Sequence, residues 1–437
     1  MTHIKNKQVV TFLSGSAGEL DWILPVLDYL SKLQFEIKIV YLTKHVQQSV
    51  EHNRMLSDYI NQPNSRVETT SCGGYFPELI EKYGYLMHRI NTKLNKPKLL
   101  SIFFYIVEKV CERVFIINLP KHILQNGHDC SLIFSEFPSL RRPRDQWIKR
   151  VFNKSIFFYF PHSPHVYTED LNRRYSNPKL EGSNRNNFLL LGHPGDYNKL
   201  NETGNFNVPE LECICLGHPK YSDLWLSHYQ KKANHFRLNA NCNKVNILVM
   251  SRGVGNYLSK ESHKLLVETI IKVVNDQFSD YKLFVKKHPR ELDSHWDNMI
   301  DQYPSIIFVD EHILQMACKV NFAISFWTSG AMDCFMLGTP VIEFFDPADS
   351  VLSQVLDADI PTTIYRKLNI VLPAINEAEL KLAVCRITKK DYEVSLNIAH
   401  PFFRDLINRS NKWHIELNKI LINKSILHKN ELLEFNE

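Results

Sequence analysis

Short apolar runs alternate with segments of helical periodicity, and this alternation restarts partway along the chain. Its clearest stretch begins with an apolar run at 245–250, followed by a loop at 251–259 and a helical pattern over 260–277. Strands separated by helices favour a parallel, doubly wound sheet. The same alternation continues with strands at 281–285, 306–309, 322–325 and 341–344 and helices at 313–319 and 331–337.

The pattern also opens the chain. A strand is expected at 9–13, a loop at 14–18 and a helix with apolar spacing over 20–30. Further strands are expected at 36–41, 132–134, 156–160 and 188–191, with a helix at 98–118. We therefore predict an α/β protein built from two Rossmann-like domains.

The domain boundaries follow from length and polarity. A chain of 437 residues suits two domains, and the polar segment 224–244 has no clear apolar period, so we expect the linker there. The predicted domains are 1–230 and 245–400. Residues 401–437 are expected to return to the first domain through a helix at 402–424, whose apolar positions include Phe403, Leu406, Trp413 and Leu417.

Composition excludes several classes of protein. A hydrophobic share of 44% and a charged share of 23% indicate a globular chain. Nine cysteines without a CxxC pair indicate neither a disulfide framework nor a zinc site. The sequence shows no secretory signal pattern and no apolar segment long enough for a membrane span, so we expect a cytoplasmic protein. A net charge of +5 does not indicate nucleic-acid binding.

Two basic clusters leave two interpretations open. Lys93, Lys96 and Lys98 precede the apolar run 99–107, and a second cluster comprises Arg141, Arg142, Arg144, Lys149, Arg150 and Lys154. We favour a solvated basic face. The alternative is docking on a polyanionic glycan or on anionic lipid at the inner face of the cytoplasmic membrane. The apolar run itself is expected to pack inside.

Polar residues follow the strands of the second domain, where ligands of open parallel sheets bind. His288, Pro289 and Arg290 follow the strand at 281–285. His288 can donate a hydrogen bond, Pro289 restricts the backbone, and Lys287 or Arg290 supplies a positive charge. Thr328, Ser329 and Gly330 open the helix at 331–337, where free N–H groups favour an anion. Thr328 and Ser329 could equally be plain N-caps. Arg252, after the first strand, completes the predicted phosphate site.

Glu343 interrupts an apolar strand near its carboxyl end. An unpaired carboxylate is costly to bury, so it needs a partner. A ribose diol of a nucleotide and a structural salt bridge with Lys or Arg remain equally open.

The stretch 286–346, with its His-Pro dipeptide, Thr-Ser-Gly-Ala-Met-Asp and Gly-Thr-Pro-Val-Ile-Glu, resembles bacterial capsule-type glycosyltransferases of the GT-B fold that use cytidine-nucleotide donors. These include sialyl-, Kdo- and nonulosonate transferases and, more distantly, teichoic-acid glycerophosphotransferases. The resemblance covers about 245–346. It implies two parallel sheets facing across a cleft, with His288, Thr328 and Ser329 holding the donor phosphate.

The first domain departs from that family. The acidic pair followed by glycine, the usual base motif of many sialyltransferases, is absent in that order, and the nearest candidates are Glu19 and Asp21. An acidic residue at a helix start is equally explained by dipole compensation. His162 and His165 are candidate acceptor-side residues, with exposed loop histidines as the alternative. Asp357-Ala358-Asp359 is interpreted as a surface turn rather than a metal site.

The leading hypothesis is therefore transfer of an acidic sugar of the nonulosonic acid or Kdo type, from a CMP-sugar to a capsular or lipid-linked glycan. We expect no metal and no cofactor beyond the nucleotide-sugar donor, because a monophosphate leaving group needs no divalent ion. The alternatives are a CDP-polyol phosphotransferase, a UDP-sugar transferase and a UDP-sugar 2-epimerase. A non-catalytic scaffold is a minor third class.

Overall fold

The chain forms two compact units. The computed structural model describes residues 7–62, 66–72, 86, 98–121, 123, 132–136, 144–161, 186–197, 211–239, 244–255, 258–288, 291, 294–349, 362–428 and 430–433. The second unit includes Tyr221–Asn408, and Arg409–Glu437 belongs with the first.

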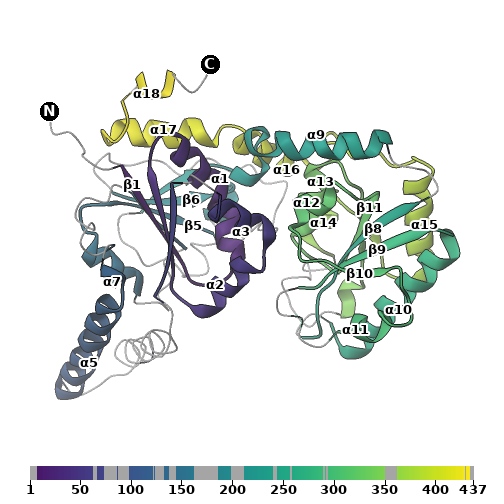
Figure 1. The fold of residues 1–437 in the computed structure, drawn as a ribbon, viewed down its shortest axis with the longest axis horizontal. Coiled ribbons are helices and arrows are strands. Elements are labelled where there is room, and N and C mark those ends of the chain that lie inside the picture. Colours follow the sequence, from purple (N-terminus) through teal and green to yellow (C-terminus); the bar gives the residue numbers. More distant parts are fainter. Residues whose placement is uncertain are drawn as a thin grey trace. The chain divides into compact units, whose positions relative to one another are not determined.

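The first unit holds a seven-stranded parallel sheet in the order β3-β2-β1-β4-β5-β6-β7 (Figure 1). Its strands are β1 (Gln8–Leu13), β2 (Glu36–Tyr41), β3 (Val67–Ser71), β4 (Leu132–Glu136), β5 (Ile156–Phe160), β6 (Asn187–Leu191) and β7 (Glu212–Cys215). Its helices include α1 (Ala17–Lys32), α2 (Lys44–Glu51), α3 (Arg54–Ile60), α5 (Lys98–Ile117), α7 (Arg144–Val151), α17 (Trp413–Asn423) and α18 (Asn430–Leu433). Every residue of β1 and of β5 is buried, which is why these strands are largely apolar in the sequence.

The second unit holds a six-stranded parallel sheet in the order β10-β9-β8-β11-β12-β13. Its strands are β8 (Val245–Met250), β9 (Tyr281–Lys286), β10 (Ile306–Phe308), β11 (Phe322–Ser325), β12 (Val341–Phe344) and β13 (Leu372–Ala374). Its helices include α9 (Asp223–Asn239), α10 (Lys260–Gln277), α11 (Trp296–Met299), α12 (Ile313–Ala317), α13 (Gly330–Met336), α14 (Ile364–Lys367), α15 (Glu377–Thr388) and α16 (Pro401–Ser410). Helices α10 and α15 cover one face of the sheet, and α12 and α13 lie with α9 over the other (Figure 1).

Both sheets follow the strand order of a doubly wound fold. In sequence order within each unit, the first strand is central, the second and third lie on one side, and the fourth follows on the other. The direction of winding therefore reverses between β1 and β4, and again between β8 and β11. The predicted fold of two Rossmann-like parallel sheets is confirmed, while the cleft between them stays a prediction.

Most of the segment 224–244, where the linker was expected, forms helix α9. Among the described side chains of this helix, Leu226 and Ala233 are buried, and the residues around them are exposed or partly exposed in no regular order. The sequence therefore shows little apolar periodicity. The helix is held in part by the Cys318 thiol, which donates to the Tyr229 carbonyl at 3.2 Å.

The expected helix at 402–424 is two helices, α16 and α17, separated at Asn411–Lys412. Phe403 of α16 packs edge-on against Phe335 of α13 with ring centroids 5.7 Å apart. In the first unit, Trp413 of α17 packs edge-on against Tyr29 of α1 at 5.3 Å, and the Asn418 amide donates to the Tyr29 hydroxyl at 2.7 Å. Figure 1 shows α17 alongside α1.

The apolar run 99–107 was expected to pack inside, and this expectation is wrong for the side chains that the structure describes. It lies on α5, where Ile102, Phe103 and Ile106 are more than half exposed. Apolar residues at successive positions point to all sides of a helix. Whichever side packs against the rest of the unit, apolar side chains on the other side stay exposed. The buried contacts of α5 lie further along it, at Cys111 and Phe115. No helix among the described residues is long and apolar enough to cross a bilayer.

The first prediction concerns the docking of α17. Trp413 is fully buried, so Trp413→Ala should lower the free energy of unfolding of the first unit by about 3–5 kcal/mol. Ile415 lies on the same helix but is 45% exposed, so Ile415→Ala should change it by less than about 0.5 kcal/mol. Differential scanning calorimetry of both variants checks this. Equal melting temperatures for the two would contradict the docking.

Candidate functional site

The carboxyl ends of four adjacent strands lie level in the second sheet. In the parallel register, Met250 of β8 pairs with Lys286 of β9 and with Ser325 of β11, and Ser325 pairs with Glu343 of β12. The loops that follow these strands therefore begin at the same edge. This edge includes the reversal of winding between β8 and β11, where ligands of open α/β sheets bind.

The buried carboxylate of Glu291 ties the loop after β9 to the loop after β8. Its Oε2 accepts the backbone N–H of His288 at 3.1 Å, and its Oε1 accepts the Ser251 hydroxyl at 2.8 Å. Ser294 donates to the same Oε1 at 2.5 Å, and His263 Nε2 lies 3.2 Å from it. A Cβ atom on Gly253 would come within 3.0 Å of Glu291, so the two loops are in direct contact.

These contacts decide the ionisation of Glu291. Burial alone would raise the pKa of its carboxyl, but hydrogen bonds from His263, Ser294, Ser251 and the His288 backbone outweigh burial and lower it. Glu291 is therefore a fixed anion that orders the backbone at His288.

Arg252 ties the loop after β8 to the loop after β11. Its guanidinium donates to the Trp327 carbonyl at 2.7 Å and lies 4.8 Å from the centre of the Trp327 ring. The indole stacks in turn with Phe345, which follows β12, at a centroid distance of 6.4 Å. Glu291 and Arg252 together thus connect the loops after β9, β8 and β11 into one structure at the winding reversal.

Trp327 has an unusual backbone. Its φ of 59° lies in the left-handed region, which a bulky side chain rarely adopts. The other described non-glycine residues with positive φ, Gln34, Asn369, Lys390 and Ser425, each come two residues after the end of a helix, where this conformation is common. Trp327 instead lies between a strand and a helix, where its carbonyl accepts from Arg252. Such strain is typical of functional loops.

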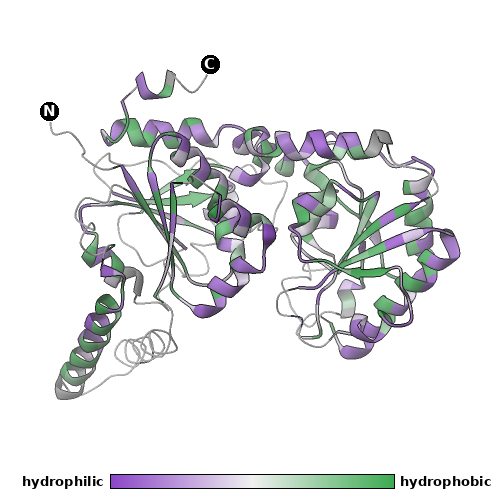
Figure 2. Cartoon of the chain, in the orientation of Figure 1, coloured by the Kyte–Doolittle hydropathy of each residue, from purple (hydrophilic) through white to green (hydrophobic). Residues whose placement is uncertain are grey.

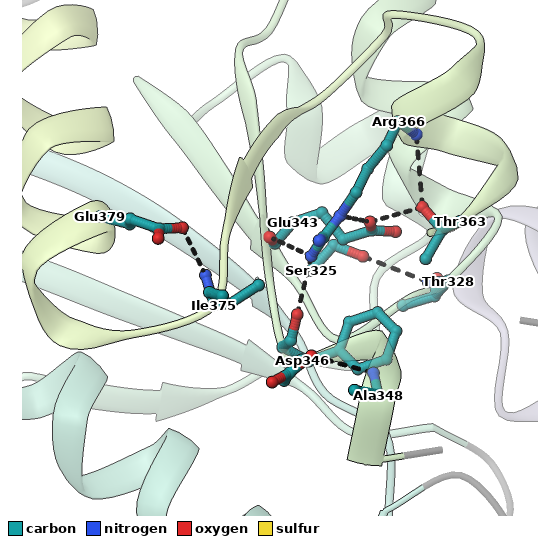
Figure 3. Close-up of polar contacts among 10 residues, drawn as sticks. Ser325, Thr328, Glu343, Asp346, Ala348, Thr363, Arg366, Ile375 and Glu379 are labelled. Carbon is teal, nitrogen blue, oxygen red and sulfur yellow. Dashed lines mark hydrogen bonds and ion pairs between the residues drawn. The ribbon is translucent and has the colours of Figure 1, made fainter. Parts of the chain in front are cut away.

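The two hydroxyls before α13 have different surroundings. The Thr328 hydroxyl accepts the Gly330 N–H at 3.0 Å. The Thr328 N–H donates to the Ser325 hydroxyl at 3.2 Å (Figure 3). Ser329 occupies the N-cap position but forms no side-chain cap hydrogen bond. Thr328 therefore acts as the capping residue, because its hydroxyl binds the N–H of Gly330, and this N–H is already used within the loop.

Glu343 forms the salt bridge that was one of its two open interpretations (Figure 3). Its Oε2 accepts from Arg366 Nε at 2.7 Å and from the Thr363 hydroxyl at 2.6 Å. Burial raises the pKa of this carboxyl, despite the attraction of Arg366 and the two hydrogen bonds. Oε1 is buried, and no described residue donates a hydrogen bond to it. The contact between Glu343 and a ribose diol stays a prediction, and a ribose hydroxyl would have to bind Oε1.

In the first unit, the carboxylates of Glu19 and Asp21 have protein partners. Glu19 is fully buried and accepts the backbone N–H groups of Ser14, at 2.7 Å, and of Gly15. Asp21 accepts from the Lys220 ammonium at 2.6 Å. The Glu19 contacts hold the backbone of the loop before α1. Dipole compensation, the alternative raised for Glu19, stays an interpretation. A base role for either residue stays a prediction.

Several predicted residues are outside the described part of the chain: Pro289, Arg290, His162, His165 and the Asp357–Asp359 turn. The charge beside His288 was assigned to Lys287 or Arg290. Lys287 forms an ion pair with Asp297 at 2.7 Å and lies 5.0 Å from the centre of the Phe308 ring. Its charge is thus partly neutralised away from the loop.

Sequence reasoning missed Glu291 and Trp327. A glutamate two residues after a His-Pro dipeptide looks like a solvated loop residue, and no local signal shows that it is buried. Trp327 offered a weak signal, because a large aromatic side chain between a strand and a helix start is unusual in a solvated turn.

The second prediction follows from the contacts of Glu291. Glu291→Gln should lower the free energy of unfolding of the second unit by about 1–3 kcal/mol at neutral pH, because buried donors lose a charged acceptor. The folded-state pKa is depressed, so the wild-type advantage is present above the unfolded pKa of about 4.3 and is lost as pH falls through the folded value. Urea denaturation across this range checks it.

The exposed Glu393 provides the matched control for that experiment. Glu393→Gln should leave stability within about 0.5 kcal/mol of wild type at each pH. A Glu291→Gln deficit that is the same at acidic and neutral pH would contradict the assignment of Glu291 as a buried anion.

Comparison with known proteins identifies the fold. No protein-family model matches the sequence, and no match is found among curated proteins. The UDP-GlcNAc 2-epimerase of Methanocaldococcus jannaschii, solved with UDP-GlcNAc and UDP, is 13% identical, with a TM-score of 0.50 over 94% of this chain and 99% of that one. The wall teichoic acid polymerase TagF is 12% identical, with a TM-score of 0.47 over 99% and 90%. A glycosyltransferase from Rickettsia africae is 12% identical, with a TM-score of 0.43 over 97% and 100%. At these identities the similarity to the epimerase concerns the fold, which is of the two-domain, GT-B-like Rossmann type.

Proposed function

We propose that this protein is a glycosyltransferase of the GT-B type whose second unit binds the phosphate of a nucleotide-sugar donor. The observation that carries the proposal is the joining of three loops, after β9, β8 and β11, by Glu291 and Arg252 at the winding reversal of one sheet. Ligands of open α/β sheets bind at this position. The residues gathered there supply a cation and neutral donors, which suit a phosphate.

Each candidate group has a distinct part in this proposal. Arg252 supplies positive charge from a position held by Trp327. His288 presents its side chain from a loop whose backbone is fixed by Glu291, and Ser329 offers a hydroxyl that is not used for capping. In the reaction, the bond between the anomeric carbon and the phosphate oxygen breaks, and the electron pair leaves with the phosphate. The acceptor hydroxyl bonds to that carbon, and its proton passes to solvent water.

The phosphate gains negative charge as the sugar departs. Donors at this phosphate therefore stabilise the transition state more than the bound donor, which raises the rate rather than the affinity alone. Glu19 and Asp21 are given no proton-transfer step in this mechanism, because backbone N–H groups and Lys220 already bind their carboxylates.

The finer proposal is a CMP-activated acidic sugar, of the nonulosonic acid or Kdo type, transferred to a capsular or lipid-linked surface glycan. Its support is the resemblance of the His288 and Thr328–Ser329 motifs to transferases with cytidine-nucleotide donors. A single phosphate as the leaving group also agrees with a mechanism that uses no metal. The epimerase structure contains UDP-GlcNAc and UDP, so uridine nucleotides are the comparison that the test must include.

The third prediction is selective protection by the nucleotide product. CMP in hundredfold excess over its dissociation constant should raise the free energy of unfolding of the second unit by about 2.7 kcal/mol. CDP and UDP should protect less at equal concentration. Thermal-shift measurements with the three nucleotides check this. Protection by UDP alone would replace the CMP donor with a uridine donor, and protection by none would contradict nucleotide-sugar binding.

The fourth prediction separates the phosphate donors from the helix cap. His288→Ala and Ser329→Ala should each lower kcat by a factor on the order of 10² to 10³, with the melting temperature unchanged, because they remove charge stabilisation. Thr328→Ala should instead lower stability by about 1 kcal/mol, because the Gly330 N–H loses its acceptor. Donor turnover and melting temperature are measured on all three variants. Unchanged kcat in His288→Ala and Ser329→Ala would remove the phosphate site.

A further inference from the structure

Helix α5 of the first unit exposes a continuous apolar face. Six of the fourteen large apolar side chains exposed among the described residues belong to this helix. They are Ile102, Phe103, Tyr105, Ile106, Val110 and Ile117, with exposures of 53–74%. Figure 2 shows α5 coloured largely as hydrophobic. Soluble monomers rarely leave so many apolar side chains together in water, so this face has an occupant.

The exposed side chains form a stripe along the helix. At 3.6 residues per turn, Ile102, Ile106, Val110 and Ile117 fall within about a quarter of the circumference. The opposite side carries the buried residues Cys111, Phe115 and Leu119, with Leu119 just beyond the end of the helix. The exposed face is therefore separate from the face by which the helix is attached.

The attachment of α5 to its unit is specific. Phe115 packs against Trp147 of α7 with ring centroids 5.4 Å apart. The buried Glu112 forms ion pairs with Arg150 of α7 and, at 2.7 Å, with Lys109. These contacts hold the helix by its second half, and Figure 1 shows α5 extending from α7 away from the sheet of its unit.

Cations lie on the apolar face and beside it. Arg113 falls within the stripe and is exposed, and Lys109 lies at its edge with its ammonium 5.7 Å from the centre of the Tyr105 ring. Lys121, just beyond the helix, is also exposed. Long basic side chains can reach lipid phosphates while apolar neighbours enter the acyl boundary. The face thus combines the two attractions of an interfacial helix.

We propose that the α5 face, defined as Ile102, Phe103, Tyr105, Ile106, Val110, Arg113 and Ile117, lies in the surface of a bilayer that contains anionic phospholipid. A helix of 20 residues is about 30 Å long, so the stripe is long enough to lie flat along the membrane. It does not cross the membrane, because charged residues interrupt its second half. Membrane binding through this face would bring the protein to a lipid-linked acceptor. Only this link to the acceptor rests on the proposed function.

Charge favours lipid over the other two candidate occupants. A second copy of this chain would bring no opposite charge to Arg113 and Lys109 if the two α5 faces met, because no residue of that face is acidic. A soluble polyanion would bind the cations but leave the apolar side chains in water. Only an anionic bilayer accommodates both kinds of side chain at once.

The test is co-sedimentation of the full-length protein with vesicles of phosphatidylcholine, with and without phosphatidylglycerol. The variant Ile102→Ser, Ile106→Ser, Val110→Ser should bind phosphatidylglycerol vesicles at least about tenfold more weakly than wild type. The matched control is Leu224→Ser, Leu265→Ser, Leu382→Ser, three helical side chains of the second unit with exposures of 56%, 65% and 62%. The control should bind like wild type.

A second pair of variants tests the charges. Arg113→Gln with Lys121→Gln should weaken binding to phosphatidylglycerol vesicles, whereas Lys282→Gln with Lys389→Gln, exposed cations of the second unit, should not. Raising salt from 0.1 to about 1 M shortens the screening length from about 10 to 3 Å, so it should weaken binding without abolishing the apolar part.

Three results would overturn the inference. They are equal vesicle binding by the apolar variant and wild type, binding of wild type to dextran sulfate but not to vesicles, and dissociation of a dimer by the apolar variant without any vesicle binding. Nucleotide protection measured on the same variants keeps the two proposals separate. Loss of vesicle binding with nucleotide protection intact leaves the proposed function standing.

Discussion

Parallel pairing in register is the constraint on which the candidate site depends. Because Lys286, Met250, Ser325 and Glu343 pair at one level, the chain must leave all four strands at the same edge of the sheet. The order of strands then separates the connections of β8 from those of β11, which run to opposite sides. Arg252 and Trp327 are in contact at that point. The strand order therefore brings the two loops together, and the side chains then form the contacts between them.

Two buried glutamates at this edge show how surroundings decide the state of a carboxyl group. Glu291 accepts hydrogen bonds from several donors, and these outweigh burial and depress its pKa. Glu343 has a guanidinium and a hydroxyl on one oxygen and no hydrogen bond from any described residue on the other, and burial raises its pKa. An anion that is fully bonded is a suitable anchor for loops. A carboxyl group with one unbonded oxygen holds Arg366 in place but remains costly to ionise.

Much of the fold could be predicted because buried parallel strands are continuous apolar runs. The bounds predicted for β8, β11 and β12 agree with the structure residue for residue. The edge strand β3 was missed because none of its residues is buried, and the edge strand β13 because it has only three residues.

The polar contacts of the site were harder to predict than its residues. Arg252, His288 and Thr328 could be identified from their places after strands, a local property of the sequence. The parts played by Glu291 and Trp327 depend on partners tens of residues away, such as Ser251 and Arg252. That a residue follows a strand can be recognised from the neighbouring sequence. Its burial and its hydrogen-bond partners are decided only when the strands come together in the fold.

The two winding reversals of this protein differ in charge, and this difference bears on where a phosphate would bind. In the first unit, the loop after β1 directs the N–H groups of Ser14 and Gly15 at the carboxylate of Glu19. The Ser14 hydroxyl donates to a second carboxylate, Glu136, at the end of β4. Backbone N–H groups in this kind of loop are the ones that hold phosphate in many doubly wound folds.

Here the chain's own anions take those donors, and a phosphate would meet like charge as well as occupied hydrogen bonds. The equivalent reversal of the second unit carries Arg252 on the loop after β8 and hydroxyl groups on the loop after β11. Glu291, which joins the loops there, is buried and accepts hydrogen bonds on both carboxylate oxygens. Opposite charge and available donors therefore occur together only at the second reversal among the described residues. This difference supports the proposed donor-phosphate site in the second unit and leaves the first unit as the proposed acceptor side.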